Sequence, residues 1–333
     1  MALTTIKAGA LADDAVEVAD LAATGTASSS TFLRGDNSWA AAGDSNLSTN
    51  TDEVILGYNA GNAISSGNYS VAVGALSLYT NATNNYNVAV GYGASYLVTG
   101  DSNTAVGHTA LRGTDSGTIT GTLNVAVGFE ELKANTTGAD NTASGYQALY
   151  SNTTGGYNTA SGNLTLYSNT TGQYNVASGF QALYTNTTGS YNTATGYKTL
   201  YLNTTGSYNT ASGHAALLLN TTASYNTANG YYALVNNTTG ANNTASGYQA
   251  LKDNSTASNN TASGYEALKV NTTGAENVAI GAYSLLSNTT GSYNVGVGGG
   301  VLLDNTTGGY NVANGWNALA NNTTGTENTG IGY

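Results

Sequence analysis

The stretch Asn141-Thr-Ala-Ser-Gly-Tyr-Gln-Ala-Leu-Tyr-Ser-Asn-Thr-Thr-Gly-Gly-Tyr157 is one copy of a 17-residue repeat that continues to Tyr333. Copies begin at residues 53, 70, 87, 103 and 124, and then at a constant interval from 141 to 328, where the last copy is partial. The slots of a copy are numbered so that Asn141 stands in slot 1 and Tyr157 in slot 17. A short fixed period predicts stacked units that contact only their neighbours, and therefore a rod rather than a globule.

The repeat keeps its apolar and small residues in phase, which distinguishes it from a disordered low-complexity tract. Leu occupies slot 9 in 14 of the 16 full copies, and Gly occupies slot 5 in all 17. Disordered segments lack such periodic apolar residues because they bury no core. The pattern therefore favours a folded stack.

Composition excludes several classes of function. The 333 residues include 7 Lys and Arg against 18 Asp and Glu, for a net charge of −11, and they include no Cys and no Pro. A chain so poor in basic residues lacks the means to bind phosphate backbones, so nucleic-acid binding is not expected. No segment approaches the length of an apolar membrane span, so no membrane insertion is expected. Without cysteine, disulfides cannot hold the fold.

Slots 1 to 5 predict a β-strand. Copies such as Asn87-Val-Ala-Val-Gly91 place β-branched residues on both sides of a small one, and the middle copies replace Val with Thr or Ser. Such residues suit a pleated surface. The glycines of slot 5, exemplified by Gly145, Gly162 and Gly179, follow the slot-3 alanines on the same face. Two small residues side by side suggest a tightly packed seam, where chains could meet.

Slots 6 to 11 are open to two interpretations. Tyr146, Leu149 and Tyr150 stand at the i, i+3, i+4 spacing of one helical turn. A second short strand is the alternative, and the helical turn is favoured. In either case the slot-9 leucines are the candidate core, represented by Leu149, Leu166, Leu183 and Leu200.

Slots 12 to 16, with the pattern Asn-Thr-Thr-Gly-x, predict a turn. Stacked coils bring equivalent residues to about 4.8 Å from one another. The slot-1 asparagines Asn141, Asn158 and Asn175 should therefore form a ladder, and so should the slot-12 asparagines that begin the turn. Side-chain amides can satisfy one another along such a column. The expected fold is a mainly β repeat solenoid, assembled as a parallel homotrimeric fibre that buries part of the tyrosine surface.

The chain divides into a non-repeating segment, residues 1–50, and the repeat region, residues 51–333. Residues 10–21 can form a short amphipathic helix, and a loop that ends near Trp39 follows it. Within this segment, Ile6, Leu11, Val16 and Trp39 are the candidate residues for attachment to a larger particle.

No catalytic constellation, cofactor site or metal site is visible, so no enzyme is expected. His108 and His214 occupy slot 6, where other copies carry Tyr or Phe, and are interpreted as aromatic substitutes. Tyr146, Tyr150 and Tyr157 stand for three aromatic columns that could stack on sugar rings or pack between chains, and packing is favoured. A threonine array that binds ice is a third interpretation, which the interspersed Asn and Gly disfavour.

Several motifs resemble parts of known proteins. Met1-Ala-Leu-Thr-Thr-Ile-Lys7 with Ala12-Asp-Asp-Ala-Val16 resembles the N-terminal segment of tail-fibre proteins of tailed bacteriophages, especially marine ones. Thr31-Phe-Leu-Arg-Gly-Asp-Asn-Ser-Trp39 resembles a short motif of phage fibres, and Gly145-Tyr-Gln-Ala-Leu-Tyr-Ser-Asn-Thr-Thr-Gly155 resembles repeats of fibre shafts. Separately, Ser70-Val-Ala-Val-Gly74 is similar to the head repeats of trimeric autotransporter adhesins.

The resemblance to tail fibres implies a homotrimer in the virion, outside the cell. Its N-terminus would dock to other virion tail proteins, and its distal part would meet a glycan or protein of the host surface. The family's fibres often carry a C-terminal chaperone domain, which is not seen after Tyr333. The expected function is thus a structural shaft for reach and attachment. The alternative is a bacterial trimeric surface adhesin that binds glycans or matrix.

Overall fold

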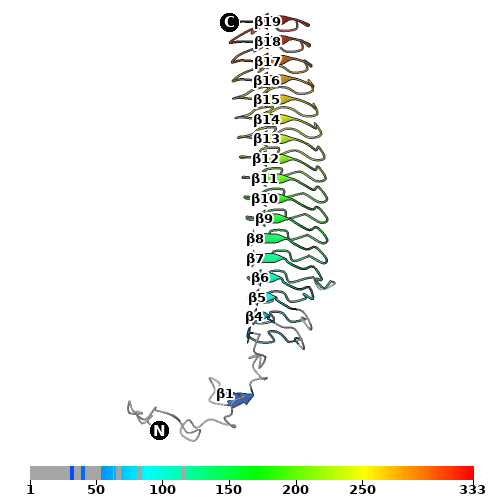
Figure 1. The fold of residues 1–333 in the computed structure, drawn as a ribbon, viewed down its shortest axis with the longest axis vertical. Coiled ribbons are helices and arrows are strands. Elements are labelled where there is room, and N and C mark those ends of the chain that lie inside the picture. The colour runs from blue at the N-terminus through cyan, green and yellow to red at the C-terminus, as the bar shows by residue number, and fades with distance from the viewer. Residues whose placement is uncertain are drawn as a thin grey trace, which may run out of the picture.

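The repeat region forms a parallel β-solenoid with one short strand in each turn (Figure 1). The structure is a computed structural model that describes residues 31–33, 39–41, 54–62, 64, 69–80, 85–114 and 117–333. The prediction of a stacked β-repeat with a 17-residue period is confirmed, because each strand pairs with the equivalent strand of the next copy. The helix expected over residues 10–21 lies outside the described residues.

The strands are short, and most contain three residues. They are β1 (Thr31–Leu33), β2 (Trp39–Ala41), β3 (Val54–Leu56), β4 (Val71–Val73), β5 (Val88–Val90), β6 (Thr104–Val106), β7 (Val125–Phe129), β8 (Thr142–Tyr146), β9 (Thr159–Ser161), β10 (Val176–Ser178), β11 (Thr193–Thr195), β12 (Thr210–Ser212), β13 (Thr227–Asn229), β14 (Thr244–Ser246), β15 (Thr261–Ser263), β16 (Val278–Ile280), β17 (Val295–Val297), β18 (Val312–Asn314) and β19 (Thr329–Ile331).

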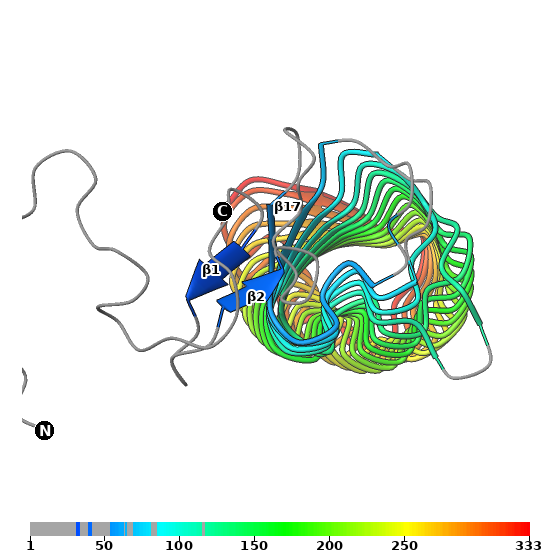
Figure 2. The same cartoon turned by 90° about the horizontal axis from the view of Figure 1, so that it is seen from below.

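Strands β3 to β19 pair in chain order as one parallel sheet along the rod, while β1 and β2 form a separate antiparallel pair. The register is strict, since Ala143 pairs with Ala160 and Ala160 with Ala177. Seen along the axis, the coils overlie one another with a gradual rotation (Figure 2). At about 4.8 Å per strand, the sheet is roughly 80 Å long. The coil toward the C-terminus is called the coil above.

From β3 to β18, each strand buries its slot-3 residue, and the residues of slots 2 and 4 are exposed or, as in β4 to β6, half-buried. In β8, Ala143 is fully buried while Thr142 and Ser144 are exposed, which is the alternation expected of a pleated strand. Gly145 follows with a φ of 144°, and a Cβ there would overlap the carbonyl group of Gly162 in the coil above. Only glycine fits that backbone and that spacing, which explains why slot 5 is invariant among the copies.

The Ala and Gly pair does not form a surface where chains could meet. The slot-3 alanines point into the interior of their own coil, and Ala143, Ala160 and Ala177 have no exposed surface. The seam suggested by two adjacent small residues therefore lies inside one chain. Slot 3 is Ala or Gly in every copy after the first, which has Ile55, because so short a coil leaves little room between the strand and the opposite wall.

Slots 6 to 11 form neither a helical turn nor a second strand, so both interpretations of this segment were wrong. Gln147 and Leu149 adopt left-handed backbone conformations, each with a φ of 53°, and the same slots do so in the other described coils. The Gln147 N–H donates to the Phe129 carbonyl below at 2.9 Å, whereas the Leu149 N–H donates to the Thr165 carbonyl above at 3.0 Å. The backbone N–H groups of this segment therefore form hydrogen bonds with neighbouring coils, where a helix would form them within the segment.

The solenoid interior consists of an apolar column beside two polar ones. Leu149, Leu166, Leu183 and Leu200 are all fully buried. The asparagines of slots 1 and 12 are also fully buried in most coils, and their side chains bond from coil to coil. Buried amides are tolerated because nearly all of them have partners in the neighbouring coil, with the Asn87 side-chain nitrogen as an exception. The core is therefore continuous along the rod and closed within a single chain.

The longest irregularity is the loop between Leu111 and Asn124, where the sequence has four extra residues. Ile119 is fully buried and forms a parallel bridge with Val98, and the Ile119 N–H donates to the Leu97 carbonyl at 2.7 Å. The loop thus returns to the stack before β7 begins. The register of the sheet continues through it.

A charge in the leucine column should open the stack locally. Leu200→Asp places a carboxylate where no water or partner reaches it, and we expect a loss of more than about 3 kcal/mol in unfolding free energy. Hydrogen exchange and limited proteolysis should show the greatest loss of protection within the coils next to residue 200. The control is Thr193→Asp, at an exposed position of the same coil. Equal protection in the two variants would contradict the assignment of the core.

The left-handed slots predict an unusual tolerance for glycine. Gln181 has a φ of 56°, and the glycines that occupy slot 7 in two other copies, Gly93 and Gly300, have φ values of 61° and 62°. Gln181→Gly should therefore leave stability within about 0.5 kcal/mol, whereas Gln181→Val should lose about 1–2 kcal/mol because a β-branched residue resists this conformation. Thermal or denaturant unfolding compares the two variants. If the glycine variant is less stable than the valine variant, the backbone at residue 181 is not left-handed as described.

Candidate functional site

The part of the chain that the structure describes offers a patterned outer surface rather than a cleft with reactive groups. Within these residues, no cluster of three or more His, Asp or Glu side chains could hold a metal ion. Three lysines of the described ranges form ion pairs within their own coil, Lys133 with Glu130 at 2.6 Å, Lys252 with Asp253 at 3.3 Å and Lys269 with Glu266 at 2.9 Å. No helix in the described ranges is long and apolar enough to cross a membrane. The surface features are therefore the candidates for function.

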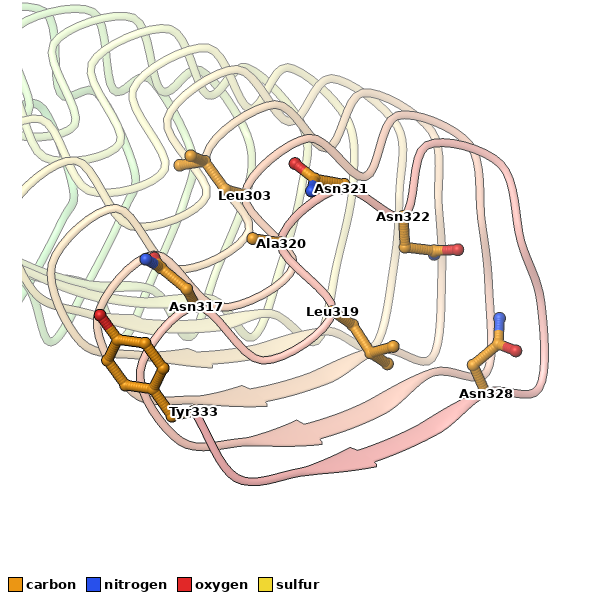
Figure 3. Close-up of a pocket in the computed structure, with 8 residues that line it drawn as sticks. All are labelled: Leu303, Asn317, Leu319, Ala320, Asn321, Asn322, Asn328 and Tyr333. Carbon is orange, nitrogen blue, oxygen red and sulfur yellow. The ribbon is translucent and has the colours of Figure 1, made fainter.

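A hollow of about 710 Å³ lies at the C-terminal end of the stack (Figure 3). Leu319, Asn322 and Asn328 line it, together with Leu303, Asn317, Ala320, Asn321 and Tyr333. Leu319, Asn322 and Asn328 stand in slots 9, 12 and 1, so this hollow is the interior that every other coil covers with the coil above. Its other lining residues include the exposed Asn317, Asn321 and Tyr333, and none of the eight side chains is charged.

Three aromatic columns run along the outside of the rod, in slots 6, 10 and 17. In the slot-17 column, Tyr157, Tyr174 and Tyr191 stack with ring centroids 4.8 and 4.9 Å apart and interplanar angles of 3° and 9°. The same column continues through Tyr208 and Tyr225. The ring faces of a column therefore point along the rod and cover one another, and the ring edges and hydroxyl groups face outward.

The three tyrosines expected to stack on sugars occupy separate columns. Tyr146 stacks on Phe129 with a centroid separation of 5.2 Å, and Tyr157 stacks on Tyr174. Tyr150 is covered on both faces, by Tyr167 at 5.1 Å and by the Lys133 Nζ at 5.4 Å from the ring centroid. Stacking of sugars on these rings stays a prediction, limited to the faces that no neighbour covers.

Both histidines lie within the slot-6 column. His108 stacks between Tyr92 and Phe129 at centroid separations of 5.3 and 5.2 Å. His214 stacks between Tyr197 and Tyr231 at 4.8 and 5.1 Å. Each imidazole thus occupies the place of a phenol ring in the column.

The asparagines of slots 1 and 12 are structural rather than accessible. The Asn158 side-chain amide donates to the Asn141 Oδ1 below at 3.1 Å and to the Gly172 carbonyl at 2.9 Å. In slot 12, the Asn169 amide donates to the Asn152 Oδ1 at 2.8 Å. The slot-12 asparagines begin Asn-Thr-Thr sequences that match glycan acceptors, yet Asn152 and Asn169 have no exposed surface. They serve the turn and the ladder.

The candidate attachment residues lie mostly outside the described residues. Ile6, Leu11 and Val16 precede the first described strand. Trp39 begins β2 and pairs with Leu33 of β1 in backbone register. Docking through these residues stays a prediction.

Glu131 is a further candidate residue, which the expectations from sequence did not include. Glu131 occupies slot 8, where most copies have Ala, and it is fully buried in its coil. Neither of its carboxyl oxygens has a hydrogen-bond partner. Burial, reinforced by the nearby Glu130 carboxylate, raises the pKa of Glu131 from 4.5 to about 7. Aligning the copies would have revealed it, because no other copy places a charged residue in slot 8.

No protein-family model matches the chain, and neither the curated proteins nor the solved structures include a match to it. Its function must therefore be inferred from the coils and from their outer surface.

Glu131 predicts a loss of stability as the pH rises. The unfolded carboxyl ionises near pH 4.5 while the folded one stays protonated to about pH 7, so the folded state binds the additional proton between these values. Unfolding free energy should fall across this window by about 3 kcal/mol and level off above it. Glu131→Gln should remove that component in denaturant titrations at pH 4, 6 and 8.

The matched control for this titration is Glu327→Gln, at an exposed acidic residue near the end of the stack. It should retain the pH dependence of the unchanged chain. If Glu131→Gln retains it as well, the buried carboxyl does not titrate as its surroundings indicate.

Proposed function

We propose that this chain is the shaft of a trimeric virion fibre, a bacteriophage tail fibre that extends from the particle and attaches it to the host cell surface. The observation that carries the proposal is the unbroken register of β3 to β19, in which each coil bonds to the next along one axis. A stack of this kind resists bending because its stiffness is the sum of its coil interfaces. Its function is mechanical reach rather than chemistry.

The two ends of the chain have different roles in this proposal. Residues 1–50, whose motifs resemble the N-terminal segment of tail fibres, would dock to other virion tail proteins. The distal part would meet a host glycan or protein. The protein would thus reside on an extracellular particle, without a cofactor, without nucleic-acid binding and without membrane insertion.

A homotrimer would have to form through the outer surface. The alanine and leucine columns are buried within one chain, so they are not available to a second copy. Tyrosines of slots 6 and 17 remain about half exposed, for example Tyr157 at 53% and Tyr225 at 59%. Aromatic side chains of this kind are enriched at protein interfaces, which supports association side by side.

The second candidate is a bacterial trimeric surface adhesin. The observation that favours it is the Val-Ala-Val strand of β4 and β5, which is similar to the strands of adhesin heads. The two functions share the rod and differ in location. Labelling with an antibody against the chain would place it on virions or on the bacterial envelope.

The proposed fibre predicts a rod with a defined mass. Electron microscopy of the purified protein should show straight rods at least about 80 Å long with a repeat near 4.8 Å along the axis. Sedimentation equilibrium should give three times the chain mass of 33.5 kDa. Purified rods should also compete with virions for adsorption to host cells. Flexible threads, or a folded monomer at micromolar concentration, would contradict the proposal.

A further inference from the structure

The outward face of the sheet changes character along the rod. Slots 2 and 4 of every strand point away from the core, and in β3 to β7 they are apolar except at Thr104. In β8 to β15 they carry Thr, Ser or Asn except at Val176, and in β16 to β18 they are apolar again except at Asn314. We call slots 2 and 4 of β3 to β7 the lower patch and slots 2 and 4 of β16 to β18 the upper patch. Slots 2 and 4 of β8 to β15 form the hydroxyl band.

Both patches expose aliphatic side chains. In the lower patch, Val54 is 48% exposed and Leu56 is 45% exposed, Val125 and Val127 are also exposed, and the same slots of β4 to β6 are half-buried. In the upper patch, Ile280 is 44% and Val312 is 45% exposed. Neither patch contains a charged residue in slots 2 and 4. Contiguous exposed apolar surface of this extent on a soluble protein marks a place of contact.

The size of the whole outward face fits a protein interface. With about 4.8 Å between strands and about 10 Å across slots 2 to 4, the two patches present roughly 400 Å², and the face from β3 to β18, hydroxyl band included, presents roughly 800 Å². This is about the area that each partner buries in a stable protein complex. Either patch alone would be too small, so one occupant that covers both is favoured.

A second copy of this chain is the occupant that the geometry favours. A partner must present apolar rows at the same axial spacing, in two groups separated by the eight strands of the hydroxyl band. A copy in parallel register does so, because it places the five strands of each lower patch together and the three of each upper patch together. An antiparallel copy would set five apolar strands against three. The parallel copy also matches hydroxyl groups with hydroxyl groups along the band.

We infer that copies of this chain pack side by side in parallel through the lower and upper patches, with the hydroxyl band as a hydrated seam between them. The inference rests on the proposed assembly of the fibre and names its contact surface. Packing of β-branched side chains from facing sheets excludes water at the patches. Water retained between Thr and Ser rows satisfies their hydroxyl groups without a close fit.

The repeat itself supplies variants that test the surface without disturbing the fold. The patch variant combines Val71→Thr, Val73→Ser, Val88→Thr and Val90→Ser, which are the residues that the hydroxyl band uses in the same slots. Loss of apolar contact at four sites per chain should weaken self-association by about a hundredfold or more. Sedimentation velocity over a range of concentrations measures this shift, and circular dichroism checks that the coils remain folded.

The control variant makes the same number of changes within the band. It combines Thr244→Ser, Ser246→Thr, Thr261→Ser and Ser263→Thr, and we expect its association to equal that of the unchanged chain. If the unchanged chain assembles and the patch variant assembles as strongly, the patches are not the contact and the inference fails while the proposed fibre survives. If the unchanged chain is itself a monomer, the proposed assembly fails first.

Cross-linking decides the orientation of the copies. The chain contains no cysteine, so Val90→Cys and Ile280→Cys each introduce one reactive thiol. With a short bis-maleimide, parallel copies should cross-link 90 to 90 and 280 to 280 in separate preparations. A product that appears only when the two variants are mixed would indicate antiparallel copies and overturn the inference. If the chain is a monomer, and residues 1–50 become more sensitive to protease in the patch variant, the lower patch contacts residues 1–50 rather than a second copy.

Discussion

The fold depends on hydrogen bonds between equivalent residues of successive coils. No coil could satisfy its own backbone, because a short loop of chain with a single three-residue strand has few partners within itself. In the β9 coil, the Thr159 N–H donates to Asn175 in the coil above and the Gly162 N–H to Ser144 in the coil below, both at 2.8 Å. Each coil is therefore stable only between two others, as in other repeat proteins.

That dependence explains why so many residues adopt an otherwise unfavourable backbone. Slots 7, 9 and 17 are left-handed in nearly every described coil, and Leu, Gln and Tyr occupy them more often than Gly. Such a conformation costs about 1–2 kcal/mol per residue in isolation. Bonding to the next coil and burial of the leucine offset that cost. The strain follows from the need to close so short a coil while aligning its amides along the axis.

The sequence predicts the period, the strand and the stacking, because these features leave a pattern in residue type. Slot 3 is small in every copy after the first, and slot 5 is glycine in all of them, because the same packing constraint repeats along the stack. The backbone of slots 6 to 11 was not predicted, since Tyr146, Leu149 and Tyr150 have the spacing of a helix. Glycine, which signals a left-handed conformation, stands in slot 7 of two copies only, at Gly93 and Gly300. The residue types also did not show which side chains point into the coil and which point outward. For this reason the slot-3 alanines suggested a seam between chains. The stacking of tyrosines on one another, by contrast, follows directly from register.

The asparagine columns give the rod an electrical direction. Backbone bonds in the sheet run both up and down, so their contributions largely cancel. In most coils the side-chain amide of slot 1 donates downward, as Asn158 does to Asn141 and Asn175 to Asn158, each at 3.1 Å. Aligned amide dipoles add, as peptide dipoles do in a helix. The end toward β19 therefore carries partial negative charge and the opposite end partial positive charge, so that two such rods placed end to end attract only head to tail.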